Sequence, residues 1–223
     1  MKEYTNKEVE LATRIGVRLK DKAGDDIMRN VKEKRNQLLR VNEEWLECHR
    51  CDIRECMKEP KVGEFSNTLL GTKTIDALFI SDMPREKEID DKPTFGGYYG
   101  YLIKRAVREA LERSPGMTLN YAFTYATACY NYKGVIPTDA IFRNCFPRVQ
   151  HLINILNPSA VVCIGAYVRD MVRPIIDKDY PEIKTYVVHH PSYIVKKGGQ
   201  AGLWYRHNYI NNMKKVLEDI WSL

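Results

Sequence analysis

A carboxylate and an aromatic ring flank a loop that the sequence places where ligands bind in α/β proteins. Residues 77–81 form a short apolar run, which predicts a buried strand, and Asp82 follows directly. Pro84 ends the strand because proline cannot join a sheet ladder. The loop continues to Phe95, and a helical pattern begins near Tyr99. Because ligands bind beyond the carboxyl ends of strands in open parallel sheets, we expect Asp82 and Phe95 to lie at a ligand site.

The spacing of the cysteines indicates a second site. Cys48 and Cys51 are separated by two residues, and Cys129 and Cys145 are separated by fifteen. The two thiolates of a C-x2-C pair can hold one edge of a metal ion or iron–sulfur cluster, and two more from a distant segment complete a tetrahedral set. Such a site would tie the first segment to the region that follows the second predicted strand.

Two other interpretations of the cysteines stay open at this point. A structural zinc site would use Cys48 and Cys51 together with Cys56 and His49. Alternatively, the thiols carry no ligand. Cys163 lies inside an apolar run and is interpreted as a core thiol.

The elements that must position these residues alternate between strands and helices. Strands are predicted at 77–81, 121–126, 160–164 and 186–189, and helices at 99–113, 139–156, from 165 onward, and at 203–221. This alternation predicts a three-layer α/β/α domain around a four-stranded parallel sheet. One residue follows each strand directly or nearly so, and these are Asp82, Thr127, Gly165 and His190. We therefore expect all four along one edge of the sheet.

The first part of the chain has a different character from the rest. Residues 1–45 are highly charged and predict a helical extension packed on the domain, which spans 46–223. Gly24, Asp25 and Asp26 predict a break between two helices in this extension. An arm that contacts DNA or a partner is the alternative interpretation.

Composition limits the class of protein. The 223 residues carry a formal net charge of +6, and 29% of them are charged, which is compatible with a polyanionic partner. No stretch approaches the roughly 18 apolar residues of a membrane span, and the amino terminus lacks the apolar core of a signal peptide. We therefore expect a cytoplasmic protein whose thiols stay reduced.

Four motifs in the same order resemble one known family. They are Ser81-Asp82-Met83-Pro84-Arg85, the segment 94–103 (TFGGYYGYLI), the segment 124–129 (TYATAC) followed by Cys145, and His190-Pro191-Ser192. With the C-x2-C pair, this set resembles the iron–sulfur uracil-DNA glycosylases of family 4, including the type associated with bacteriophage DNA polymerases. The resemblance covers about Cys48 to Trp221, and it is specific as an ordered set although each piece alone is weak.

The resemblance implies chemistry on an extruded base. A nucleotide of single- or double-stranded DNA would flip into the cleft, and water would cleave its N-glycosidic bond. Phe95 would stack on the base, and Asp82 would orient water or stabilise an oxocarbenium-like sugar. His190 would donate a hydrogen bond to the oxygen of the leaving base. Tyr125, Met83 and Tyr99 complete the implied base-binding set.

The family also implies how DNA and a cofactor are held. Tyr193 and Ile194 would wedge into the base stack. Phosphate or backbone contacts are expected from Ser192, Lys196, Lys197 and Arg206. A structural [4Fe–4S] cluster would be bound by Cys48, Cys51, Cys129 and Cys145. The implied protein is a monomer that acts inside a cell, including as a viral protein in its host.

Two positions depart from the family pattern. Tyr125 stands where the family has an asparagine that reads the base edge, and a phenol cannot copy the donor and acceptor of an amide. Asp82 stands where the family has glutamate. Three functions follow as hypotheses: a DNA glycosylase acting on uracil or a modified pyrimidine, a DNA-binding or base-sensing protein that does not cleave, and a transferase-like enzyme acting on modified DNA bases.

Overall fold

The fold is known from a computed structural model that describes residues 22–51, 74–85, 88, 94–129, 137–196 and 199–223. Its elements, in chain order, are α2 (Lys22–Leu46), β1 (Ile75–Ser81), α3 (Tyr98–Glu112), β2 (Tyr121–Tyr125), α4 (Asp139–Leu156), β3 (Pro158–Ile164), α5 (Ala166–Asp179), β4 (Lys184–Val188), α6 (Pro191–Lys196) and α7 (Gly199–Trp221). No helix in these ranges is long and apolar enough to cross a membrane.

The four strands form one parallel sheet in the order β2-β1-β3-β4. At the carboxyl edge, Ser81 of β1 pairs with Tyr125 of β2, and Ile164 of β3 pairs with Val188 of β4. Since all strands run the same way, the residues that follow them meet at this edge. The prediction of a four-stranded parallel sheet is confirmed.

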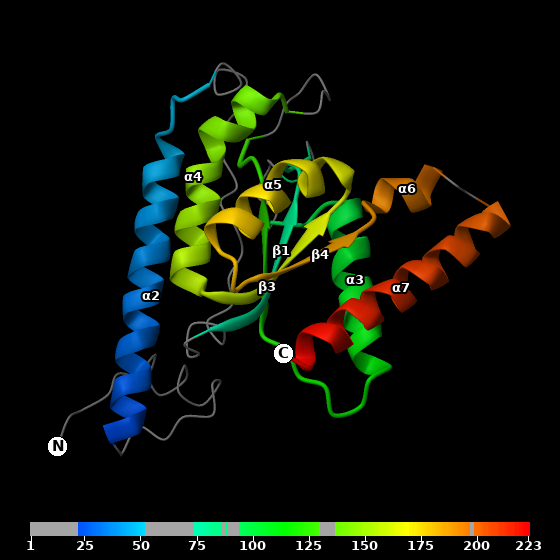
Figure 1. Cartoon of the computed structure of the whole chain (residues 1–223), viewed down its shortest axis with the longest axis horizontal. Helices are drawn as coiled ribbons and strands as arrows, with labels where there is room; N and C mark the ends of the chain where they lie inside the picture. The colour runs from blue at the N-terminus through cyan, green and yellow to red at the C-terminus, as the bar shows by residue number, and fades with distance from the viewer. Residues whose placement is uncertain (1–21, 52–73, 86–87, 89–93, 130–136, 197–198) are drawn as a thin grey trace.

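Helices cover both faces of the sheet and make three layers (Figure 1). One core lies between the sheet and α4 and α5, with side chains such as Leu78, Val161 and Leu152. The other lies between the sheet and α3, α6 and α7, with side chains such as Phe79 and Val107. Successive strand residues alternate between the two cores because their side chains point to opposite faces.

Helix α2 adds a further layer outside α4 (Figure 1). Its apolar side chains Val31, Leu38, Val41 and Trp45 are buried in the core that α4 shares. The predicted break at 24–26 is wrong, because α2 runs through these residues without interruption. Packing of the apolar face outweighs the low helix propensity of one glycine and two aspartates. The division of the chain at residue 45 stays a prediction.

Two helix ends near the predicted boundaries have clear causes. The Thr138 hydroxyl accepts a hydrogen bond from the Ile141 backbone N–H at 3.4 Å, which caps α4 as predicted. Asn157 ends α4 in the left-handed conformation, with φ of 48°. Elsewhere the structure differs from the sequence analysis, because α6 forms directly after His190 and α7 begins at Gly199 instead of Leu203.

Candidate active site

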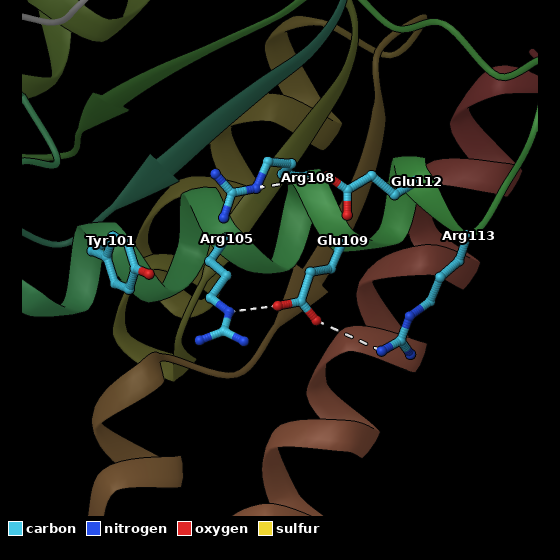
Figure 2. Close-up of a pocket in the computed structure, with 6 residues that line it drawn as sticks. All are labelled: Tyr101, Arg105, Arg108, Glu109, Glu112 and Arg113. Atoms are coloured by element: carbon cyan, nitrogen blue, oxygen red, sulfur yellow. Dashed lines mark hydrogen bonds and ion pairs between the residues drawn. The ribbon is translucent and has the colours of Figure 1, made fainter.

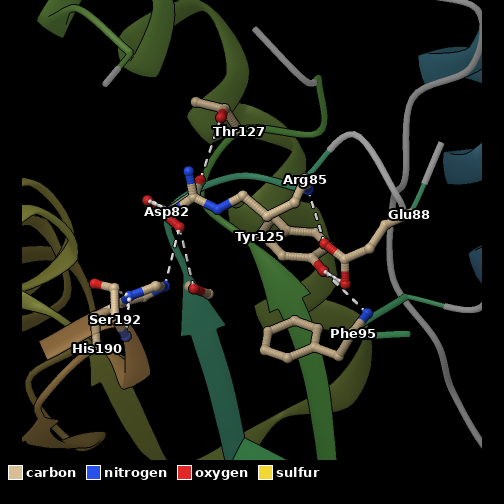
Figure 3. Close-up of polar contacts among 9 residues, drawn as sticks. Asp82, Arg85, Glu88, Phe95, Tyr125, Thr127, His190 and Ser192 are labelled. Atoms are coloured by element: carbon tan, nitrogen blue, oxygen red, sulfur yellow. Dashed lines mark hydrogen bonds and ion pairs between the residues drawn. The ribbon is translucent and has the colours of Figure 1, made fainter. Parts of the chain in front are cut away.

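Asp82 and His190 meet at the carboxyl edge of the sheet. The Asp82 Oδ1 atom lies 3.8 Å from the His190 Nε2 atom, although 107 residues separate them in the chain. Their side chains are 13% and 16% exposed, so solvent reaches the pair only partly. Asp82 follows β1 and His190 follows β4, two strands that β3 separates. The expected convergence of a carboxylate and an imidazole is confirmed (Figure 3).

The residues after the other two strands hold the backbone of this edge. Thr127, which follows β2, donates from its backbone N–H and its hydroxyl to the Asp82 carbonyl oxygen, at 2.9 and 3.2 Å. Gly165, which follows β3, has a φ of 97°, and a Cβ there would lie 3.1 Å from the Cβ of His190. Glycine is therefore needed both for its backbone conformation and for the close approach of His190.

The hydrogen bonds of His190 set which ring nitrogen carries the proton. Its Nδ1 atom accepts the Ser192 backbone N–H at 3.1 Å and lies 2.8 Å from the Ser192 hydroxyl oxygen. A neutral imidazole that accepts at Nδ1 carries its proton on Nε2. Burial lowers the pKa of His190 from its usual 6.5, and Asp82 opposes this shift. The ring is therefore neutral near pH 7 and directs an N–H toward the site.

Asp82 also has a charged neighbour, Arg85. The Arg85 Nη2 atom donates to Asp82 Oδ2 at 2.7 Å. The guanidinium carbon also lies 5.9 Å from the ring centre of Tyr99, whose ring makes an edge contact with His190 at 5.3 Å. Asp82 thus has one oxygen directed at a cation and the other at the imidazole. Charge-assisted hydrogen bonds of this length are among the stronger ones in proteins.

Phe95 and Tyr125, predicted to bind the base, are packed against each other. Their ring centres are 4.6 Å apart with 15° between the planes. Only 1% of Phe95 and 2% of Tyr125 is exposed, and Met83 is equally buried. Phe95 has a φ of 59°, which is unfavourable for a residue with a Cβ. Its backbone N–H donates to the Tyr125 hydroxyl at 2.9 Å, and this bond holds the conformation in place.

Glu88 is a buried carboxylate that the sequence analysis missed. It is 2% exposed. Its Oε1 atom accepts the Tyr125 hydroxyl at 2.7 Å and the Gly97 N–H at 3.1 Å, and its Oε2 atom accepts the Arg85 N–H at 2.8 Å. The sequence carries no signal for it, because Glu86, Asp90 and Asp91 in the same segment look alike.

The residues predicted to contact DNA are divided by burial. Tyr193 is 42% exposed and stacks on His189 at 5.0 Å, so it is available to a ligand. Ile194 is 8% exposed and packs in the core beneath α6, which contradicts the prediction that it wedges into a base stack. The cause is the unpredicted helix α6, which turns Ile194 inward.

The basic residues predicted near the site have different placements. Lys196 is exposed at the end of α6, and its charge adds to the lowering of the His190 pKa. Arg206 is half-buried on α7. Lys197 lies outside the described residues. The Ser192 hydroxyl is hydrogen-bonded to the His190 ring, so Ser192 orients the imidazole. Its predicted contact with DNA stays a prediction.

The four cysteines of the predicted cluster belong to segments that touch one another. The Asn144 side-chain amide donates to the Arg50 carbonyl oxygen at 2.7 Å, which joins the C-x2-C segment to the helix that carries Cys145. The Ala128 N–H donates to the Cys145 sulfur at 3.2 Å, which brings the neighbour of Cys129 to the same helix. Among the described residues, no three His, Cys, Asp or Glu side chains are grouped closely enough to hold a metal ion. Cys56 lies outside the described residues.

A hollow of about 460 Å³ on α3 is lined mostly by charged side chains (Figure 2). It is lined by Tyr101, Arg105, Arg108, Glu109, Glu112 and Arg113. Glu109 pairs with Arg105 and, at 3.6 Å, with Arg113, and Glu112 pairs with Arg108 at 3.9 Å. Exposed pairs of this kind contribute little, and no residue predicted to act on a ligand lies in this hollow.

Comparison with known proteins agrees with the geometry. The family model described as the uracil DNA glycosylase superfamily matches residues 70–214. This range includes Asp82, Phe95, Tyr125 and His190, together with the complete sheet. No curated protein matches the chain.

Proposed function

The chain belongs to the uracil-DNA glycosylase superfamily, and on that premise we propose that it is a DNA glycosylase that hydrolyses the N-glycosidic bond of an extruded uracil or modified pyrimidine. The observation that carries this proposal is the approach of Asp82 Oδ1 and His190 Nε2 to 3.8 Å at the carboxyl edge of the sheet. Enzymes that act on a base in DNA must take it out of the stack into such a site. We further propose that the protein acts as a monomer.

His190 supplies a hydrogen-bond donor to the leaving base. When the N-glycosidic bond breaks, the bonding electrons go to the base and negative charge develops on its carbonyl oxygen. A neutral imidazole with its proton on Nε2 stabilises that charge without itself losing a proton. Ser192 supports this role, because its backbone N–H occupies Nδ1 and prevents the ring from adopting the other tautomer.

Asp82 acts on the sugar side of the same bond. Its carboxylate stabilises the positive charge that develops on the sugar, or orients the water that attacks the anomeric carbon. Arg85 forms an ion pair with the carboxylate at 2.7 Å and so competes with the sugar for its charge. Contact of Arg85 with a DNA phosphate would release Asp82 for catalysis, because a guanidinium binds phosphate well.

We propose a structural [4Fe–4S] cluster as the cofactor, with the four cysteines of the sequence pattern as its ligands. The support is the chemistry of four thiols together with the contacts that join their segments, Asn144 to Arg50 and Ala128 to Cys145. Hydrogen bonds such as the one from the Ala128 N–H to the Cys145 sulfur orient the ligands of metal sites. Bound, such a cluster would hold the segments together and carry no step of the reaction.

Base release from defined DNA strands tests the function. Single- and double-stranded oligonucleotides carrying uracil or one of a panel of modified pyrimidines are incubated with the protein and then treated with alkali, which cuts the strand wherever a base has been lost. We expect scission at the modified position with at least one strand. No scission with any member of the panel would refute the glycosylase proposal.

A non-cleaving, base-sensing protein is the second candidate. Two observations favour it: Arg85 offsets the negative charge of Asp82 in an ion pair, and the Tyr125 ring covers the Phe95 ring. This candidate requires selective binding of a strand that carries a modified base, without release of that base. Catalytic turnover on any strand would eliminate it.

A further inference from the structure

The Phe95 and Tyr125 rings stack on each other, so Tyr125 fills the position in which an extruded base would stack on Phe95. Their centres lie 4.6 Å apart at 15° (Figure 3), which is the near-parallel arrangement that bases also adopt on aromatic side chains. Phe95 makes a second, tilted contact with Phe123 at 5.0 Å and is only 1% exposed. While Tyr125 holds this position, Phe95 offers no open face to a base.

The hydroxyl of Tyr125 is fully engaged. It donates to Glu88 Oε1 at 2.7 Å and accepts the Phe95 N–H at 2.9 Å. Burial, and after it the nearby Glu88 carboxylate, raises the pKa of Tyr125 far above its usual 10. The hydroxyl therefore keeps its proton at any working pH and has no further hydrogen to offer a base.

Tyr125 is anchored from both sides. Glu88 also accepts N–H groups from Gly97 and Arg85, so the carboxylate that holds the hydroxyl is itself fixed. On the other side, the fully buried Arg148 of α4 donates to the Tyr125 carbonyl oxygen and, at 3.0 Å, to the Thr124 hydroxyl. Moving the ring would leave buried polar groups without partners, which is costly.

We propose that Tyr125 is a specificity-determining residue whose ring excludes plain uracil from the stacking position on Phe95. The inference rests on the proposed function and narrows its substrate class. A base that offers only a pyrimidine ring gains stacking alone, and this does not offset the hydrogen bonds that Tyr125 would lose. A pyrimidine with additional hydrogen-bonding substituents can replace those bonds. The substrate is therefore a polar, modified pyrimidine.

Binding of a base that cannot be released tests the exclusion separately from catalysis. The probe is a single-stranded oligonucleotide with 2′-deoxypseudouridine, in which a carbon–carbon bond joins the uracil ring to the sugar. The reference is the same strand with a tetrahydrofuran residue that lacks a base. The ratio of the two dissociation constants, at fixed salt, measures recognition of the base. We expect a ratio near one for the wild type and at least about tenfold tighter binding of the probe by Tyr125→Ala.

Two further variants identify the responsible group. Tyr125→Phe keeps the ring but loses the hydroxyl bonds to Glu88 and Phe95 that anchor it, so its preference for the probe should lie between those of the wild type and Tyr125→Ala. Tyr121→Ala removes a tyrosine from the other end of β2, where it contacts Phe79 and Phe123, and should also leave the ratio unchanged. Circular dichroism confirms that each variant is folded.

The outcomes separate this inference from the proposed function. If the wild-type protein binds the probe about tenfold more tightly than the strand without a base, the proposed exclusion by Tyr125 is wrong. A folded Tyr125→Ala protein with a ratio near one would overturn it as well, as would equal gains in Tyr125→Phe and Tyr125→Ala. If the protein releases no base, the glycosylase proposal is refuted. The binding ratios do not depend on base release, so they still decide whether Tyr125 excludes uracil.

Discussion

Removal of the His190 imidazole tests the proposed chemistry most directly. In His190→Ala the leaving base loses one donor, the N–H at Nε2, because Nδ1 is occupied by the Ser192 N–H. The donor is only 16% exposed and is held in place before the reaction begins. Loss of one such preorganised donor costs about 10²- to 10³-fold in rate. We expect base release to slow by that factor.

Folding should change little in the same variant. The His190 Nε2 and Asp82 Oδ1 atoms are 3.8 Å apart, and burial keeps the imidazole neutral near pH 7, so no strong ion pair is removed. We expect the free energy of unfolding, measured in urea, to fall by about 1 kcal/mol or less. A rate effect without a matching stability effect separates a chemical role from a structural one.

The assay is single-turnover base release with protein in excess over a strand that the wild type cleaves. The neighbouring histidine provides a matched control, since His189 is exposed and stacks on Tyr193 instead of facing Asp82. His189→Ala should release the base at the wild-type rate. Wild-type rate in His190→Ala, or equal losses in both variants, would refute the assignment of the donor to His190.

Three other outcomes are expected. The contribution of His190 to the free energy of unfolding should be constant above pH 6.5 and decline below it: burial lowers the pKa of His190, so the folded protein binds fewer protons there than the unfolded chain. A loss of stability that depends on His190 and is centred above pH 6.5 would contradict this. Trp45→Ala should lower the free energy of unfolding in urea by about 3–5 kcal/mol, because the indole is buried between α2 and α4. The exposed Leu46→Ala should change it by less than about 0.5 kcal/mol, and equal losses would argue against the packing of α2. Protein purified without oxygen should be brown, absorb near ~400 nm and hold about four irons per chain. Cys145→Ser should lose that iron and Cys163→Ala, which alters a core thiol of β3, should keep it; a colourless sample with stoichiometric zinc would contradict the cluster.

The pattern of apolar runs was enough to predict the sheet and the position of its edge. Short runs such as 77–81 alternate with helical segments, and this order requires parallel strands with crossover helices. From that order alone, Asp82 and His190 could be predicted to share an edge. The N-cap at Thr138 was also predictable, because it depends on residues within one turn.

Contacts between distant segments decided the rest. Glu88 looks like any other acid of a charged loop, and only the fold places it against the Tyr125 hydroxyl, 37 residues away. The break predicted at 24–26 is absent because α2 packs against α4. Ile194 points inward because α6 packs on a core whose other residues come from distant parts of the chain. Sequence order thus determined which residues reach the edge, since strands that are joined by crossover helices run parallel. Whether the Phe95 ring is open to a base depended on the packing of Tyr125 against it, and packing is settled only when the layers close around their cores.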